Sequence, residues 1–134
     1  VQRAIVSYTF PTSFQTGNAA FTAIDLSNIV PLAADIFPEA TTIKAILRVE
    51  YMCETGGTPP TTGEAALLNY TDNPGGTPTV THSTVSLPFT TSWKQAVSSE
   101  FEITGAKNYK IVFRVVTGSK KVKIQGATLI LKYE

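Results

Sequence analysis

The chain has 134 residues and a formal net charge of +1, from 11 lysines and arginines against 10 aspartates and glutamates. This length predicts one domain over residues 1–134, and so small a net charge excludes the strong field that would concentrate nucleic acid. No apolar stretch approaches the ~20 residues that a membrane-spanning helix needs, and the 20 threonines, which are β-branched, favour β structure.

The beginning of the chain predicts two strands. Residues 4–10 (AIVSYTF) alternate apolar and polar and stop at Pro11, which indicates an edge strand. Residues 20–26 predict a second strand. For residues 1–40 as a whole, an N-terminal arm that reaches a neighbouring subunit is an alternative to full incorporation in the domain.

The middle of the chain predicts a connection followed by strands. Prolines at positions 31 and 38 limit any helix between them to a turn or two. Residues 42–53 form the clearest strand, because apolar side chains alternate with charged ones that a one-residue slip would bury. Further strands are predicted at residues 64–71, 80–87 and 93–103, and the loops before the first two are rich in glycine, proline and threonine.

Residues 108–133 predict two more strands around a Thr-Gly-Ser-Lys turn, which we interpret as a hairpin. The apolar residues of the final strand change parity across Gly126 and Ala127, and such a change needs an extra residue. A β-bulge at Gly126 is therefore predicted.

The chain thus shows about eight strands and no amphipathic helical period. This pattern predicts an all-β fold, a single antiparallel β-sandwich. A jelly-roll topology is favoured over an immunoglobulin-like one, because the long loops suit crossings between two sheets.

No residue pattern indicates catalysis, so we expect no enzyme and no catalytic residue. His82 is the one histidine, and no G-x-S-x-G sequence surrounds any serine. Carboxylates for glycoside cleavage would have to come from Glu50, Glu54, Glu64, Glu100 and Glu102. Because Glu100 and Glu102 share an outward face near lysines, a solvated charge ladder is the expected arrangement.

Metal ligands are equally sparse, and no metal or cofactor is expected. One histidine and Cys53 cannot supply a zinc site, and Cys53 ends a buried face, where a free cysteine acts as a small apolar side chain. Asp72, Asn73 and the Asn69 carbonyl lie in one turn and leave calcium as an open alternative, although calcium needs six to eight oxygens.

One basic group could bind phosphate or an anionic sugar, although a solvated face that protects a strand edge is commoner. Its members are Lys107, Lys110, Lys120, Lys121 and Lys123. Aromatic side chains bear on neutral sugars, because sugar-binding modules expose flat rings. Most tyrosines fall on apolar faces, so Trp93 and Tyr70 are the candidate ligand-binding residues, and Phe89 is a third candidate. A carbohydrate-binding module of a secreted or virion protein is the alternative function.

Four apolar residues interrupt outward faces that are otherwise polar: Ile46, Met52, Val112 and Val116. Since the mean hydropathy is +0.07 and only 16% of residues are charged, such surface favours association, and we predict that these four lie in an interface. The leading hypothesis is a structural subunit that forms a homo-oligomer and contacts other structural proteins of its assembly. The single Met and single Cys favour a heat-tolerant protein.

The strand pattern of residues 43–133 resembles that of β-sandwich domains in tailed-phage and other virion structural proteins. The sequences concerned are AALLNYTDN, VTHSTVS, SSEFEI and YKIVFRVVTGSKKVKIQGATLILKY. The resemblance implies a capsid decoration, fibre or tail-associated subunit, commonly a trimer, located in a virion or outside the cell. Such families share no active site, so no functional residue is carried over.

Overall fold

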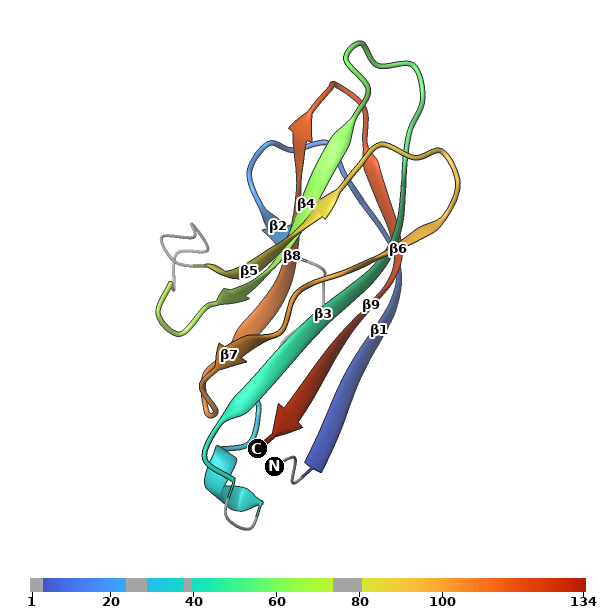
Figure 1. The fold of residues 1–134 in the computed structure, drawn as a ribbon. Helices are drawn as coiled ribbons and strands as arrows, with labels where there is room; N and C mark the ends of the chain where they lie inside the picture. Colours follow the sequence, from blue (N-terminus) through green and yellow to red (C-terminus); the bar gives the residue numbers. More distant parts are fainter. Residues whose placement is uncertain (1–3, 24–28, 38–39, 74–80) are drawn as a thin grey trace.

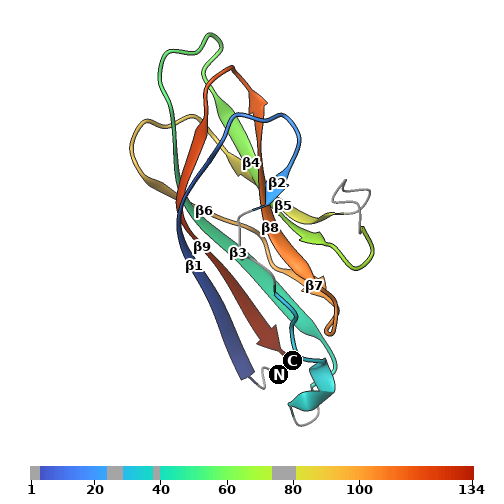
Figure 2. The ribbon, with the colours of Figure 1, turned by 180° about the vertical axis from the view of Figure 1, so that it is seen from behind.

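The computed structural model describes residues 4–23, 29–37, 40–73 and 81–134, the first three residues of the last range by their backbone alone. This part of the chain forms strands and one short 3-10 helix (Figures 1 and 2). The elements are β1 (Ala4–Thr16), β2 (Thr22–Ala23), η1 (Ala34–Ile36), β3 (Ile43–Cys53), β4 (Thr62–Asn69), β5 (Thr81–Leu87), β6 (Lys94–Val97), β7 (Phe101–Ile103), β8 (Tyr109–Thr117) and β9 (Val122–Tyr133).

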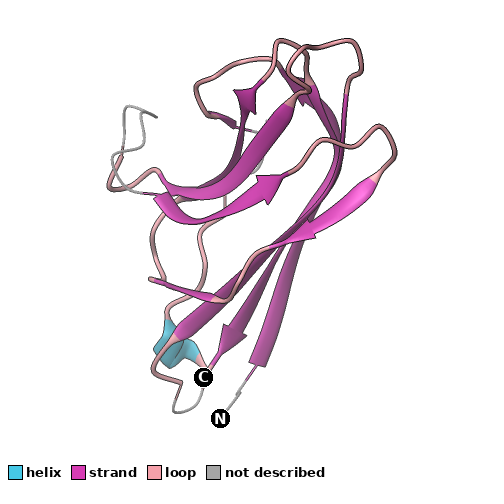
Figure 3. Ribbon diagram, turned by 45° about the horizontal axis from the view of Figure 1, so that its top comes forward, coloured by secondary structure: helices cyan, strands magenta, loops and turns pink. Residues whose placement is uncertain are grey.

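Two antiparallel sheets pack face to face as a sandwich (Figure 3). Sheet A has the order β1-β9-β3-β6, with β7 also paired to β3, and sheet B has the order β2-β8-β4-β5. The chain changes sheet at every connection except β4 to β5 and β6 to β7. This alternation confirms the predicted β-sandwich with jelly-roll topology, in which eight strand positions form two four-stranded layers.

The strand predicted over residues 93–103 is divided into β6 and β7, which occupy one position beside β3. The division falls at Ser98, whose hydroxyl accepts a hydrogen bond of 2.9 Å from the backbone N–H of Leu47. A serine hydroxyl that replaces a backbone partner in this way competes with a regular ladder. The alternation of residues 94–103 does not predict that the Ser98 hydroxyl replaces a backbone hydrogen-bond partner here.

The predicted hairpin of residues 108–133 is wrong. β8 pairs with β2 and β4 in sheet B, whereas β9 pairs with β1 and β3 in sheet A, so the Thr-Gly-Ser-Lys turn crosses between the sheets. Apolar alternation indicates a strand with one buried face, but it does not show which strand lies beside it.

β1 is an edge strand, as predicted, but it does not stop at Pro11. It continues to Thr16, with a register irregularity between Pro11 and Phe14. An edge strand tolerates proline because it is paired on one side only. The second predicted strand is present as β2, and residues 24–26 of that prediction lie outside the described residues.

The described part of residues 1–40 joins the sandwich. β1 pairs with β9, β2 pairs with β8, and Ile29 exchanges two backbone hydrogen bonds with Tyr109, of 2.9 and 2.7 Å. In the described part of the connection between the prolines, residues 31–37, η1 is the one helical turn, as the sequence predicts. An arm that reaches a neighbour stays a prediction.

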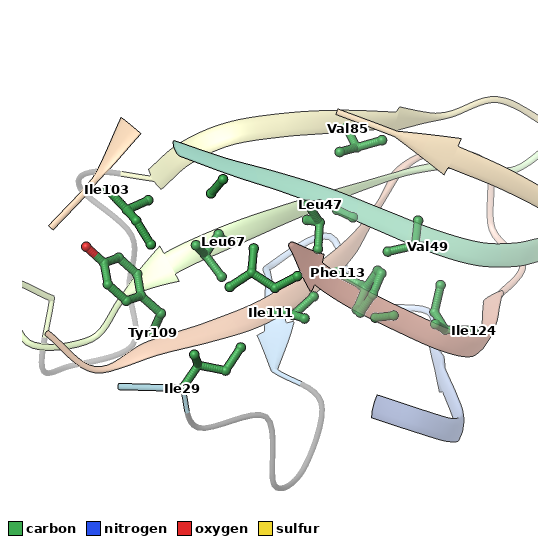
Figure 4. Packing of buried hydrophobic residues seen from close by; sticks show 14 of the residues in the cluster. Ile29, Leu47, Val49, Leu67, Val85, Ile103, Tyr109, Ile111, Phe113 and Ile124 are labelled. Carbon is green, nitrogen blue, oxygen red and sulfur yellow. The ribbon is translucent and has the colours of Figure 1, made fainter. Parts of the chain in front are cut away.

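The core lies between the sheets and receives side chains from both (Figure 4). Every second residue of β3 is buried there, as predicted from the alternation: Ile43, Ala45, Leu47, Val49, Tyr51 and Cys53. Sheet B contributes Leu67, Ile111 and Phe113 from the other side. No helix in the described ranges is both long and apolar enough to cross a membrane.

The predicted bulge is confirmed. Glu50 of β3 pairs with Gly126 and Tyr51 pairs with Ile124, so Gln125 is the extra residue of β9. Ile124 and Ala127 are both buried, which is the change of parity visible in the sequence. The bulge turns the Gln125 side chain toward solvent on the outer face of sheet A.

Candidate interaction surface and ligand site

The five glutamates considered for catalysis are each engaged by a neighbouring side chain. Within sheet A, ion pairs join Lys132 to Glu100 at 3.0 Å and Lys44 to Glu102 at 4.0 Å. The other contacts are Arg114 with Glu64 at 3.0 Å, Lys123 with Glu54 at 4.0 Å, and the Gln125 amide with Glu50 at 2.8 Å. The pairs of Glu100 and Glu102 with lysines form the predicted charge ladder. The structure describes the backbone of His82 in β5 but not its side chain.

The turn after β4 uses its oxygens internally. The Asn69 side chain donates to Asp72 at 2.7 Å and accepts from the Asp72 backbone N–H at 3.1 Å. Lys107 lies 3.0 Å from the other Asp72 carboxylate oxygen, and the Asn73 side-chain amide donates to the Asn69 carbonyl at 2.8 Å. Within the described ranges no cluster of three His, Cys, Asp or Glu side chains is suited to a metal ion.

The five lysines do not form one basic group. Lys107 and Lys110 lie at the start of β8, where Lys110 stacks on Tyr70 with its Nζ 4.4 Å from the ring centre. Lys120 and Lys121 follow the far end of that nine-residue strand. At about 3.3 Å per residue, the two groups are separated by roughly 30 Å.

Cys53 is fully buried, as predicted for a core side chain. Burial raises the pKa of its thiol above the ordinary value, because the thiolate would lose its hydration. Tyr51 is likewise buried and donates a hydrogen bond of 2.8 Å to the Pro88 carbonyl. Desolvation also raises the pKa of Tyr51. Neither group is poised for chemistry.

The two aromatic candidates lie on different sheets. Trp93 precedes β6 in sheet A and is 45% exposed. It lines a hollow of about 420 Å³ together with Thr12–Gln15 and Lys123–Gln125. Tyr70 follows β4 in sheet B and packs on Leu68 and Val112. They therefore cannot form one binding site.

A larger hollow, of about 490 Å³, lies where the sheet edges β5 and β6 approach each other. It is lined by Tyr51, by residues 84–86 and Pro88, and by residues 94–99. Lys94 is the one lysine, arginine, aspartate or glutamate of this lining, so the hollow offers no acid and base pair.

An apolar stripe crosses the outer face of sheet A, and we define it as Ile5, Ile130, Ile46 and Val97. Ile130 is the direct cross-strand partner of Ile46. Ile5 is paired with Lys132 and Val97 with Arg48, which places each of them diagonal to an isoleucine of the stripe. Ile5 is 54% exposed, Val97 is 53% exposed, and the central isoleucines are partly exposed. Polar side chains of the neighbouring rows border the stripe.

The four predicted interface residues are not one surface. Ile46 belongs to the stripe, Met52 lies nearer the end of β3 beside a hollow of about 260 Å³, and Val116 is 49% exposed on sheet B. The prediction that Val112 faces outward and uncovered is wrong, because it is 1% exposed. It packs with Ala66 and Leu68 under Phe21 and Ala23, which form a second, smaller core on the outer face of sheet B.

Three stripe residues were missed by the sequence analysis, although the signal was present. Ile130 lies between the buried Leu129 and Leu131, and Ile5 lies between Ala4 and Val6. Strict alternation places both on the outward face, by the same argument that selected Ile46. What the sequence does not contain is the register that brings them together.

Comparisons with known proteins show the fold. No protein-family model matches the sequence, and no sequence relative is found among curated proteins. The chain is similar to the Eiger TNF structure from S. frugiperda, with a TM-score of 0.54 and 6% identity over 98% of this chain and 94% of that one. It is also similar to a chain of the infectious bursal disease virus Gt strain, with a TM-score of 0.55 and 11% identity. That match covers 98% of this chain and 33% of the viral one.

A weaker likeness, with a TM-score of 0.47 and 14% identity, is to a carbohydrate-binding module of Cellvibrio mixtus lichenase 5A in complex with cellotriose. It covers 96% of this chain and 97% of the module. The likenesses to the Eiger TNF and viral chains establish the β-sandwich alone, because one fold carries many unrelated functions.

Proposed function

We propose that the chain is a non-enzymatic structural subunit that associates with further copies of itself through the apolar stripe. The stripe carries this proposal. Isolated exposed apolar residues are ordinary on a protein surface, whereas a contiguous group bordered by polar side chains marks an interaction site. Association would remove Ile5 and Val97 from water, the two most exposed members.

The assembly that we propose is a virion, in which the subunit decorates the capsid or forms part of a fibre, or an extracellular filament. The likeness to a viral chain and the strand-pattern resemblance to virion domains support this setting. Three subunits are the expected number, by the same resemblance. The contacts of the five glutamates considered for catalysis support a non-enzymatic role, since a neighbouring side chain engages each carboxylate.

The test is the solution mass of a stripe variant, Ile46→Thr with Val97→Thr, measured by light scattering. Threonine keeps the β-branched shape that suits a strand and adds a hydroxyl, so the monomer should still fold. We expect the variant to dissociate at protein concentrations at which the wild type stays assembled.

The matched control is Val116→Thr, because Val116 is 49% exposed and lies on sheet B. We expect this variant to assemble as the wild type does. Assembly that persists in the stripe variant, or that is lost in the Val116 variant alone, would contradict association through the stripe.

The second candidate is glycan binding at the Trp93 hollow. The observation that favours it is an exposed tryptophan beside the polar side chains of Thr12, Ser13 and Gln15. An aromatic face stacks on the apolar face of a sugar ring, and hydroxyl and amide groups bond its hydroxyls.

Because Trp93 is the single tryptophan, its fluorescence reports directly on this hollow. If the hollow binds sugar, titration with soluble oligosaccharides shifts the emission saturably, and Trp93→Ala abolishes binding measured by calorimetry. A glycan array without signal for the wild type removes this candidate.

A further inference from the structure

The free edge of β1 is unusual among the strand edges of the sandwich. Within the described ranges β9 is the one strand paired with β1, and in both ribbon views β1 lies at the margin of its sheet (Figures 1 and 2). β1 has 13 residues, whereas the opposite edge of sheet A is divided between β6, with four, and β7, with three. Unpaired backbone groups along a long edge are a template for another strand.

Residues 4–16 contain no Lys, Arg, Asp or Glu, so the usual protection of an edge by charge is absent. The opposite edge carries Lys94, Glu100 and Glu102. A second strand could therefore pair with β1 without placing like charges opposite each other. The protection that β1 does have is Pro11 and the irregularity that follows it. The stretch left open is Ala4–Phe10.

The inward side chains of this stretch are incompletely covered. Ala4, Val6, Tyr8 and Phe10 pack against the core but remain partly exposed. β5, the long edge of sheet B, differs in this respect, because the inward side chains described there, Val85 and Leu87, are 4% and 0% exposed. Pairing at β1 would bury further apolar surface, whereas Val85 and Leu87 have almost none left to bury.

We propose that Ala4–Phe10 pairs antiparallel with the same segment of a second copy, so that sheet A continues from one sandwich into the next. This inference rests on the proposed structural role and adds an edge contact to the face contact of the stripe, with Ile5 belonging to both. A second copy fits because its β1 presents the same uncharged edge and the same partly covered apolar row.

The register follows from the alternation. The inward residues of this segment have even numbers, so the inward rows of the two copies meet only if even-numbered residues oppose even-numbered ones. A slip of one residue would place the apolar row of one copy beside the polar row of the other. Centring the seven residues on each other places Ser7 opposite Ser7 on a two-fold axis. Val6 then faces Tyr8 of the copy, and Ile5 faces Thr9. The stripes of both copies reach the shared edge at Ile5.

Disulfide trapping tests this register in the full chain. Directly opposed residues of antiparallel strands have Cα atoms about 4.5 to 5.5 Å apart, which is within the range that a disulfide spans. Ser7 is exposed, so Ser7→Cys leaves the core unchanged, and the native Cys53 is buried and does not compete. Under mild oxidation we expect Ser7→Cys to migrate as a dimer without reductant and as a monomer with it.

Three single variants serve as controls. Thr9→Cys should remain unlinked alone but should link to Ile5→Cys when the two proteins are mixed and reassembled. Gln95→Cys, exposed on the opposite edge of sheet A, should remain unlinked. Absence of a Ser7→Cys dimer, or equal linking at Ser7 and Gln95, overturns the proposal.

Failure of the edge contact can be told apart from failure of the structural role. A wild type that is assembled by light scattering but whose Ser7→Cys variant does not link retains the role and excludes this edge. A wild type that is monomeric throughout excludes both.

Discussion

Burial governs the pKa values of several core side chains. Cys53, Tyr109 and Tyr133 are each 0% exposed, and desolvation is the main cause that raises their pKa values. Both tyrosine hydroxyls donate to backbone carbonyls, of Thr104 at 3.0 Å and Leu32 at 2.9 Å. Burial therefore favours the neutral form of each group.

Cys53 should be unreactive in the folded protein. A thiol reagent needs access and a thiolate, and the buried Cys53 has neither, since its pKa is raised. We expect the reaction to be at least about 10³-fold slower than in denaturant, because it waits for unfolding. A colorimetric thiol assay with and without denaturant measures this ratio. Rapid labelling of the native protein would contradict the burial.

Stability should fall at alkaline pH. The pKa values of Tyr109 and Tyr133 are raised by desolvation above the ordinary value of 10.0, so the folded state holds these protons more tightly than the unfolded state does. The free energy of unfolding is therefore unaffected by these groups below about pH 10 and decreases as the pH rises above it.

Tyr133→Phe isolates one of these contributions. It should be less stable at neutral pH by about 1 kcal/mol, since it loses the hydrogen bond to Leu32. Its stability should also decrease less steeply above pH 10 than that of the wild type. Denaturant unfolding at several pH values measures both, and identical pH profiles would refute the assignment.

At the scale of elements, the sequence predicts where most strands lie but not always which strands pair with each other. β3 was predicted nearly to the residue because its charged residues permit one register only. The exposure of Val112 in β8 is predicted wrongly. The run Ile111, Val112, Phe113 is apolar on both faces, which is typical of a central strand covered on both sides. Its cover, Phe21 and Ala23, comes from a part of the chain about 90 residues earlier, and no local pattern contains such a contact.

Two glycines in strands should respond differently to alanine. A Cβ at Gly63 in β4 would lie 2.8 Å from a Val122 methyl and 2.9 Å from the Arg114 carbonyl oxygen, whereas a Cβ at Gly126 meets no heavy atom within 4 Å. Gly63→Ala should lower the free energy of unfolding by about 1–3 kcal/mol through overpacking. Gly126→Ala should leave it unchanged or raise it by less than about 1 kcal/mol.

Thermal or denaturant unfolding of both glycine variants checks this expectation. The pair is well matched, because each glycine lies at a register irregularity and neither has a positive φ. Equal destabilisation of both variants would contradict the open space above Gly126.

At the scale of the whole molecule, the fold class and the jelly-roll preference followed from strand count and loop length, but the candidate site did not. Ile46 was selected as an outward apolar residue, yet the stripe exists only because register aligns it with Ile130 and brings Ile5 and Val97 to the diagonals. Local alternation determines which face of the strand a residue occupies, but the pairing of strands distant in sequence determines which residues lie side by side on that face.

The stripe and the free β1 edge together suit a protein that is incomplete as a monomer. The edge contact is two-fold and joins copies in pairs, so in combination with the face contact it would extend the assembly beyond a pair. Heat tolerance, expected from the single Met and single Cys, would follow equally from association, because assembly stabilises the folded state by mass action.

The measurement that tests the structural role most directly is the mass of the wild-type protein by light scattering across a dilution series, before and after heating. We expect a discrete species of three or more copies that persists on dilution. A monomeric mass of 14.4 kDa at every concentration would contradict the account.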